Sequence, residues 1–147
     1  MSFKILNTLT KYSQKGSFTF NATDSLRVVC NAPADRSGIY LVFCTVSDDI
    51  IYIGRSGKRN SDGDIFVRKA GLGGMKDRIV NGHQFGKIAR RISWPTQMKI
   101  ERIDAIRILW FATHDNDHND CPTKVENILL SIFKSEYNKL PRWNKMG

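Results

Sequence analysis

The chain has 147 residues, of which 41% are hydrophobic and 25% are charged, a composition typical of a folded globular protein. This length predicts one domain with a full hydrophobic core, which excludes disordered, collagen-like and multi-domain architectures. Lys and Arg number 23 against 14 Asp and Glu, a net charge of +9 that favours nucleic acid as the class of partner.

The cysteines and the apolar runs indicate the cellular compartment. Cys30, Cys44 and Cys121 are an odd, widely spaced set, which favours buried thiols in a reducing environment over a disulfide framework. The wholly apolar runs, such as residues 108–112, are far too short to span a membrane, and the N-terminus lacks the features of a signal peptide. We therefore expect a cytoplasmic protein that does not associate with membranes.

The first part of the chain alternates short apolar segments with turn-rich segments. Residues 1–37 are interpreted as an N-terminal extension packed on a domain of residues 38–147, with short strands at 17–20 and 26–30. Residues 38–44 and 50–54 are rich in β-branched and aromatic side chains and are separated by a polar turn, which predicts a hairpin.

The rest of the chain predicts helices around one more strand. Residues 55–74 lack periodicity and form a long loop; residues 74–81 form a short helix that ends at Gly82. Residues 85–92 have apolar side chains at helical spacing, which predicts an amphipathic helix with a basic outer face. A central strand at 105–113 and a helix at 123–137 complete an α+β domain with a small antiparallel sheet covered by helices.

The excess of positive charge is concentrated between residues 55 and 91. A basic stripe of this kind follows phosphate groups, although a merely solvated basic surface has the same composition. The residues predicted to contact DNA are Arg55, Lys58, Arg59, Arg68, Lys69, Lys87, Arg90 and Arg91.

Glu126 lies on the apolar face of the last predicted helix, with Leu129, Leu130 and Phe133 at helical spacing from it. A buried carboxylate needs a cation, a metal ion or a cluster of donors, because it is costly to bury unpaired. The two interpretations left open are a functional site and a salt bridge to an arginine that faces the core.

Tyr40 and Tyr52 are predicted to project from the same face of the hairpin as near or diagonal neighbours. Gly54 removes a side chain beside Tyr40 and leaves room for a ligand to approach the backbone. The alternative is that the two tyrosines pack through their rings without a function.

The tripeptide Gly38-Ile39-Tyr40 is followed after eleven residues by Tyr52-Ile53-Gly54, and this pattern resembles the signature of the GIY-YIG nuclease superfamily. The resemblance covers residues 38–144. It implies a three-stranded antiparallel sheet flanked by helices and hydrolysis of phosphodiester bonds in double-stranded DNA. The segment from Gly54 to Arg78 is longer than in the minimal pattern of the superfamily. In this respect the chain is closest in character to the restriction-endonuclease branch.

The resemblance also implies the site residues. Tyr40 and Tyr52 match the two motif tyrosines, and His83 is similar to a histidine that some of these enzymes place near the site. For the asparagine that follows the glutamate, spacing favours Asn138 and sequence context favours Asn144, and both stay open. The implied catalytic residues are Tyr40, Tyr52, Arg78, His83, Glu126 and either Asn138 or Asn144.

The chemistry requires these residue types. Glu126, the one predicted metal ligand, holds Mg²⁺ or Mn²⁺ while the ion keeps most of its waters. Arg78 supplies a planar donor fork to the phosphate, and Tyr52 orients it. Tyr40, with a pKa lowered by the metal and the arginines, activates the water, and His83 assists.

Other patterns are weaker. Asp115, Asp117 and Asn119 precede Glu126 at calcium-loop spacing, but Asp120 replaces the required glycine. His114, His118 and Cys121 lack a fourth zinc ligand. The rival functions are a non-catalytic DNA-binding domain and an RNA-processing nuclease, and the oligomeric state is open, with a homodimer among the options.

Overall fold

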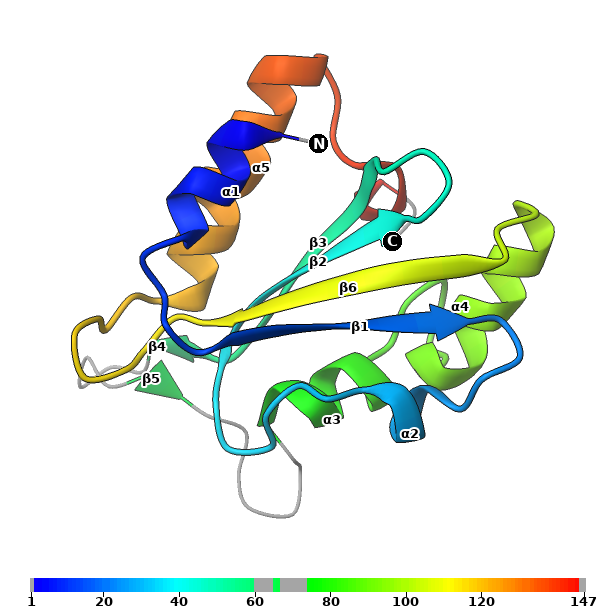
Figure 1. Cartoon of the computed structure of the whole chain (residues 1–147), viewed down its shortest axis with the longest axis horizontal. Coiled ribbons are helices and arrows are strands. Elements are labelled where there is room, and N and C mark those ends of the chain that lie inside the picture. The colour runs from blue at the N-terminus through cyan, green and yellow to red at the C-terminus, as the bar shows by residue number, and fades with distance from the viewer. Residues whose placement is uncertain (1, 60–64, 67–73, 146–147) are drawn as a thin grey trace.

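The computed structural model describes residues 2–59, 65–66 and 74–145, without the side chains of residues 58, 59, 65 and 66. Four antiparallel strands form the main sheet in the order β1-β6-β2-β3 (Figure 1). They are β1 (Lys15–Asn21), β2 (Gly38–Cys44), β3 (Ile50–Ser56) and β6 (Ala105–Ala112). The α+β class is confirmed, but the expected three-stranded sheet is wrong by one strand.

The additional strand comes from the predicted N-terminal extension. β1 pairs with β6 along its whole length, from Lys15 opposite Phe111 to Asn21 opposite Ala105, and buries Phe18 and Phe20. The strand expected at 17–20 is therefore confirmed and is longer than expected. The strand expected at 26–30 is wrong, because this segment forms the single-turn helix α2 (Leu26–Val29). A short apolar run does not distinguish a strand from a buried helix.

The hairpin of β2 and β3 is confirmed. Its register runs from Gly38 opposite Ser56 to Val42 opposite Tyr52, and then shifts so that Phe43 lies opposite Ile50. The shift leaves Ile51 as an additional residue in β3, the arrangement of a β-bulge. Because β2 also pairs with β6, its side chains are buried on both faces of the sheet.

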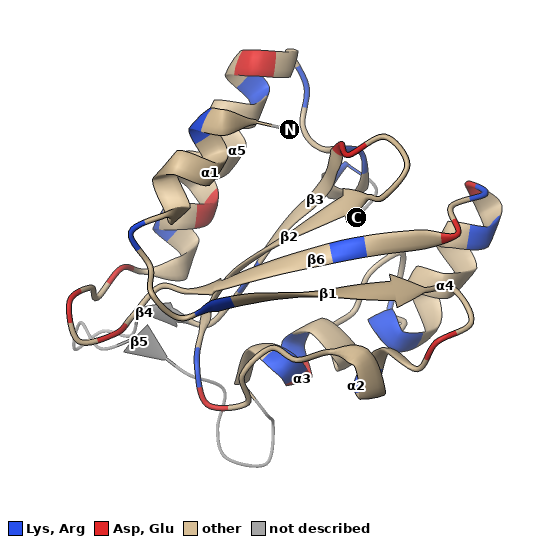
Figure 2. Ribbon diagram, viewed as in Figure 1, with Lys and Arg blue, Asp and Glu red and all other residues tan. Residues whose placement is uncertain are grey.

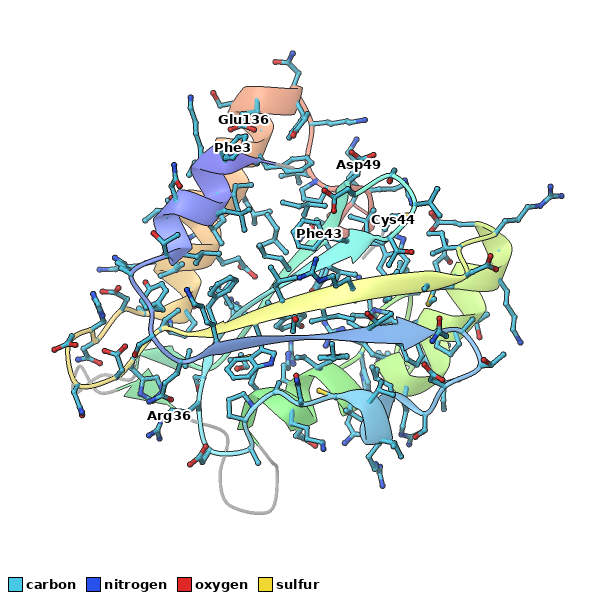
Figure 3. The ribbon with its side chains drawn as sticks, viewed as in Figure 1. Phe3, Arg36, Phe43, Cys44, Asp49 and Glu136 are labelled. Atoms are coloured by element: carbon cyan, nitrogen blue, oxygen red, sulfur yellow. The ribbon has the colours of Figure 1, made fainter. Side chains whose placement is uncertain are left out.

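Helices cover both faces of the sheet (Figure 1), and side chains fill the space on either side of it (Figure 3). One face is covered by α1 (Phe3–Leu9) and α5 (Pro122–Tyr137). The other is covered by α2, α3 (Gly74–Asn81), α4 (Arg90–Ile100) and the 3₁₀ turn η1 (Arg142–Asn144). The expected helices at 74–81 and 123–137 are confirmed.

The helix expected at 85–92 is wrong in position, because α4 begins only at Arg90. Phe85 and Gly86 have φ values of 60° and 109°, and Ala89 is extended with ψ at 142°, so the backbone before Arg90 is not helical. Ile88 and Ile92, expected in the core, are 44% and 52% exposed.

The long segment expected to be a loop contains a short two-stranded sheet of β4 (Lys58–Arg59) and β5 (Ile65–Phe66). Two of the predicted DNA contacts, Arg68 and Lys69, lie outside the described residues. Cys30, Cys44 and Cys121 form no disulfide bond. Within the described part of the chain, no helix has both the length and the apolar character needed to cross a membrane.

Candidate active site

Tyr40 and Tyr52 lie on one face of the hairpin, as the sequence predicts. Tyr40 is opposite Gly54 and Tyr52 is opposite Val42, so the two tyrosines are diagonal neighbours, and their ring centroids are 5.9 Å apart. A Cβ atom on Gly54 would lie 2.6 Å from the Tyr40 hydroxyl oxygen. The space above Gly54 is thus filled by the Tyr40 ring itself, and not by a ligand as the sequence suggested.

Tyr40 is fully buried, and its hydroxyl makes no hydrogen bond of good geometry among the described residues, although it lies close enough to Tyr52 for the two phenols to interact. Burial raises the pKa of Tyr40 well above its ordinary value, and the charges of Arg90 and Arg78 only partly oppose this. The lowered pKa expected for Tyr40 is therefore not found in the protein without a metal, because desolvation outweighs the nearby cations. Buried hydroxyls that lack a well-formed hydrogen bond are uncommon in folded proteins, which sets Tyr40 apart from most other buried side chains of this face.

Arg90 is the centre of a buried polar network beneath the two tyrosines. Its side chain is only 2% exposed, and its guanidinium lies 5.7 Å from the Tyr40 ring centroid and 5.6 Å from that of Tyr52. Nη2 donates to the Tyr52 hydroxyl over 3.1 Å. The prediction that Arg90 contacts DNA is wrong, because the first residue of α4 points into the core instead of lying on a solvent-exposed helix face.

Gly82 makes room for this arginine. A Cβ atom at Gly82 would collide with Nη1 of Arg90, and the backbone N–H of Arg90 donates to the Gly82 carbonyl over 2.9 Å. The helix does end where the sequence predicts, at Asn81. Gly82 is not in the left-handed conformation of a typical glycine stop, so its place is explained by the close approach of Arg90.

Arg78 and His83 are brought together. They line a shallow pocket of about 260 Å³ with Asn81 and Gly82, at the C-terminal end of α3. The Arg78 side chain is partly buried, and the His83 side chain is exposed. A cation and an imidazole therefore share one opening to solvent, as the resemblance implies.

Glu126 lies in the second turn of α5, and its side chain is 19% exposed. Its Oε1 accepts a hydrogen bond from Nε of Arg55 over 3.2 Å. Burial raises the pKa of Glu126, and Arg55 and the more distant Arg78 lower it in part. Glu126 therefore forms a salt bridge, but its partner Arg55 is 38% exposed and is not the core-facing arginine of the alternative interpretation. Arg55 is also one of the predicted DNA contacts.

The two asparagines have local structural roles. Asn144 accepts from the backbone N–H of Ile53 over 3.0 Å and donates to the Ile53 carbonyl over 2.9 Å, so it acts as a hydrogen-bonding partner at the outer edge of β3. Asn138 ends α5 with φ at 60°. It follows Glu126 by twelve residues, just beyond the last helical residue Tyr137, and about 18 Å of rise along the helix axis separates these two side chains, too far to share one site.

The structure describes only some side chains of the predicted basic stripe. Lys87 and Arg91 are exposed, and Lys58 and Arg59 lie on β4. Figure 2 shows Lys and Arg on the helices of both layers, and acidic residues in the loop between β6 and α5. The charge of the described residues is therefore more widely distributed than the sequence order indicates.

Neither alternative metal site is assembled. Asp115 accepts from the backbone N–H groups of Asp117 and His118, and Asp120 accepts from Tyr12 and Lys11. The described residues contain no group of three or more His, Cys, Asp or Glu side chains placed to hold a metal ion. A metal ion held by the described residues must therefore rely on fewer protein ligands.

Sequence reasoning missed Gln84 and Trp94. Oε1 of Gln84 accepts from Nε of Arg90 over 2.9 Å and from Nε1 of Trp94 over 3.0 Å. No local pattern marks these residues, because their roles depend on a buried arginine that the sequence places on the surface.

The chain was compared with models of protein families, with curated proteins and with solved structures, and no match was found in any of the three comparisons.

Proposed function

We propose that this protein is a Mg²⁺-dependent DNA endonuclease of the GIY-YIG type, with restriction-like character, acting in the cytoplasm on double-stranded DNA. The observation that carries the proposal is the tyrosine pair. Tyr40 and Tyr52 meet on one face of the hairpin, and the buried Tyr40 hydroxyl is within the electrostatic influence of Arg78. The charge of the same arginine also reaches Glu126.

Glu126 fits a weakly held Mg²⁺ or Mn²⁺. One partly buried carboxylate is enough for an ion that keeps most of its waters and completes its shell with a substrate phosphate. When bound, the ion supplies Lewis-acid stabilisation of the phosphate oxygens. Arg55 shares this carboxylate and favours its charged form.

Each residue of the candidate site has a distinct role in this proposal. Arg78 binds the phosphate and stabilises the charge that develops on it. Tyr52 orients the phosphate through a hydroxyl that Arg90 holds in place. Tyr40 keeps its proton at neutral pH and donates a hydrogen bond. His83, in the same pocket as Arg78, accepts the proton of the attacking water.

A second candidate function is a DNA-binding domain without catalysis. The ion pair of Glu126 with Arg55 favours this second function, because a carboxylate whose charge is balanced by an arginine is a weaker metal ligand. The two functions predict different results with the same substrate.

The deciding experiment incubates the purified protein with plasmid DNA and Mg²⁺. We expect cleavage by the wild type, and losses of about 10²-fold or more in Glu126→Gln and Arg78→Ala, since each removes transition-state stabilisation. Asp115→Asn is the matched control, and it keeps its activity because the partners of Asp115, in its own loop and at Ser13, are not predicted site residues. Intact plasmid with wild-type protein that still retards DNA in a gel establishes the binding domain instead.

A further inference from the structure

Arg90 is a buried cation that forms no ion pair with a carboxylate of the described residues. Its side chain is 2% exposed. Removing a guanidinium from water is costly, so the surrounding groups must compensate for the lost hydration. Three aromatic rings and three hydrogen bonds do this, and two of the rings belong to Tyr40 and Tyr52.

The three donors of Arg90 connect three different parts of the candidate site. Nη1 donates to the carbonyl of Arg78 over 2.7 Å, Nη2 to the hydroxyl of Tyr52 over 3.1 Å, and Nε to the amide oxygen of Gln84 over 2.9 Å. Only a planar fork with several donors in fixed directions can bind these acceptors together. Arg90 therefore links α3, β3 and the segment before α4.

The hydrogen bond from Arg90 to Tyr52 also sets the direction of the Tyr52 O–H bond. Because the Tyr52 hydroxyl oxygen accepts from Arg90, its own O–H must point away from the guanidinium. The bond to the Arg78 carbonyl likewise fixes the backbone from which the Arg78 side chain extends. A neutral side chain of similar volume would fill the same space without either effect.

We propose that Arg90 is a positioning residue of the active site, which orients the Tyr52 hydroxyl and the backbone of Arg78 without touching DNA. This inference rests on the proposed nuclease function. The sequence predicts that Arg90 contacts a phosphate of DNA. In this inference Arg90 instead acts inside the core.

The test measures kcat, KM for DNA and the unfolding midpoint for Arg90→Lys, Arg90→Met and Tyr52→Phe. We expect Arg90→Met to lower kcat by about 10²-fold with KM changed less than about threefold, because misplacement affects the chemical step. Arg90→Lys keeps the charge but not the fork, and recovers about tenfold of that loss. Arg107→Met, a substitution of an exposed arginine on β6, is the matched control and leaves kcat and KM unchanged.

Further results distinguish the inference from its alternatives. A raised KM with an unchanged kcat would place Arg90 on DNA, and a lowered unfolding midpoint with an unchanged kcat would make it purely structural; either overturns the inference. If Arg90→Met does not fold, Arg90→Lys and Tyr52→Phe decide by the same criteria. An inactive wild type overturns the proposed function itself, and is recognised before any variant is measured.

Discussion

The two faces of the sheet are packed by different physical means. Beneath α1 and α5 the core is almost entirely apolar, and its members from the central strand β2 are Ile39, Leu41 and Phe43. On the opposite face, Tyr40 lies over a network of hydrogen bonds around Arg90 and Gln84. Apolar packing depends on area and volume, whereas hydrogen bonds require direction. Both faces therefore contribute stability through a buried apolar core, and the second face also fixes geometry through its hydrogen bonds.

Leu129→Ala is the strongest way to break the apolar face. Leu129 is fully buried on α5, and its truncation is expected to lower the free energy of unfolding by about 3–4 kcal/mol through lost burial and a cavity. Urea unfolding measures this loss. Ile128→Ala, on the same helix and 51% exposed, is the control and changes the unfolding free energy by less than about 1 kcal/mol. Equal losses in both variants would contradict the assigned core.

Gln84→Met tests the polar face. It removes one amide oxygen and leaves two buried donors, on Arg90 and Trp94, without their acceptor, at a cost of about 2–3 kcal/mol in unfolding free energy. If the comparison of the faces holds, this variant also loses cleavage activity per folded molecule, and Leu129→Ala does not. Gln14→Met, at an exposed glutamine, serves as the control for both measurements. Unchanged activity in Gln84→Met would separate the network from the site.

Tyr12→Phe has the smallest expected effect and lies at the margin of the apolar face. The Tyr12 hydroxyl donates to Oδ2 of Asp120 over 2.6 Å. Burial raises the pKa of Asp120, but the hydrogen bonds from Tyr12 and Lys11 outweigh this and lower it. The carboxylate thus adds stability above its unfolded pKa, near 4, and this stability is lost as the pH falls through the lower folded pKa.

The expected loss in Tyr12→Phe is therefore about 1 kcal/mol at pH 7, where the bond is charge-assisted, and smaller at pH 3. Urea unfolding at the two pH values measures the difference. Tyr137→Phe, at a tyrosine that is 43% exposed, shows no such dependence on pH. A loss that is equal at both pH values would mean that Asp120 is not the partner that matters.

The sequence by itself determined the elements that depend on local pattern. The hairpin that pairs Tyr40 with Gly54, the helix that carries Arg78 and the helix that carries Glu126 were all predicted within a few residues. The side-chain periods of strands and helices report which face is buried, and glycine and proline mark where an element ends. The shared face of Tyr40 and Tyr52 followed from the same rule.

Only the tertiary structure decided which partners these elements meet. The pairing of β1 with β6, the burial of Arg90 and the ion pair of Glu126 with Arg55 join residues far apart in the chain. The raised pKa of Tyr40 has the same origin, because desolvation depends on every group packed around the hydroxyl. A local sequence pattern predicts that a charged side chain is exposed to solvent. Arg90 is buried because Gly82, Gln84 and the aromatic rings together make room for its guanidinium.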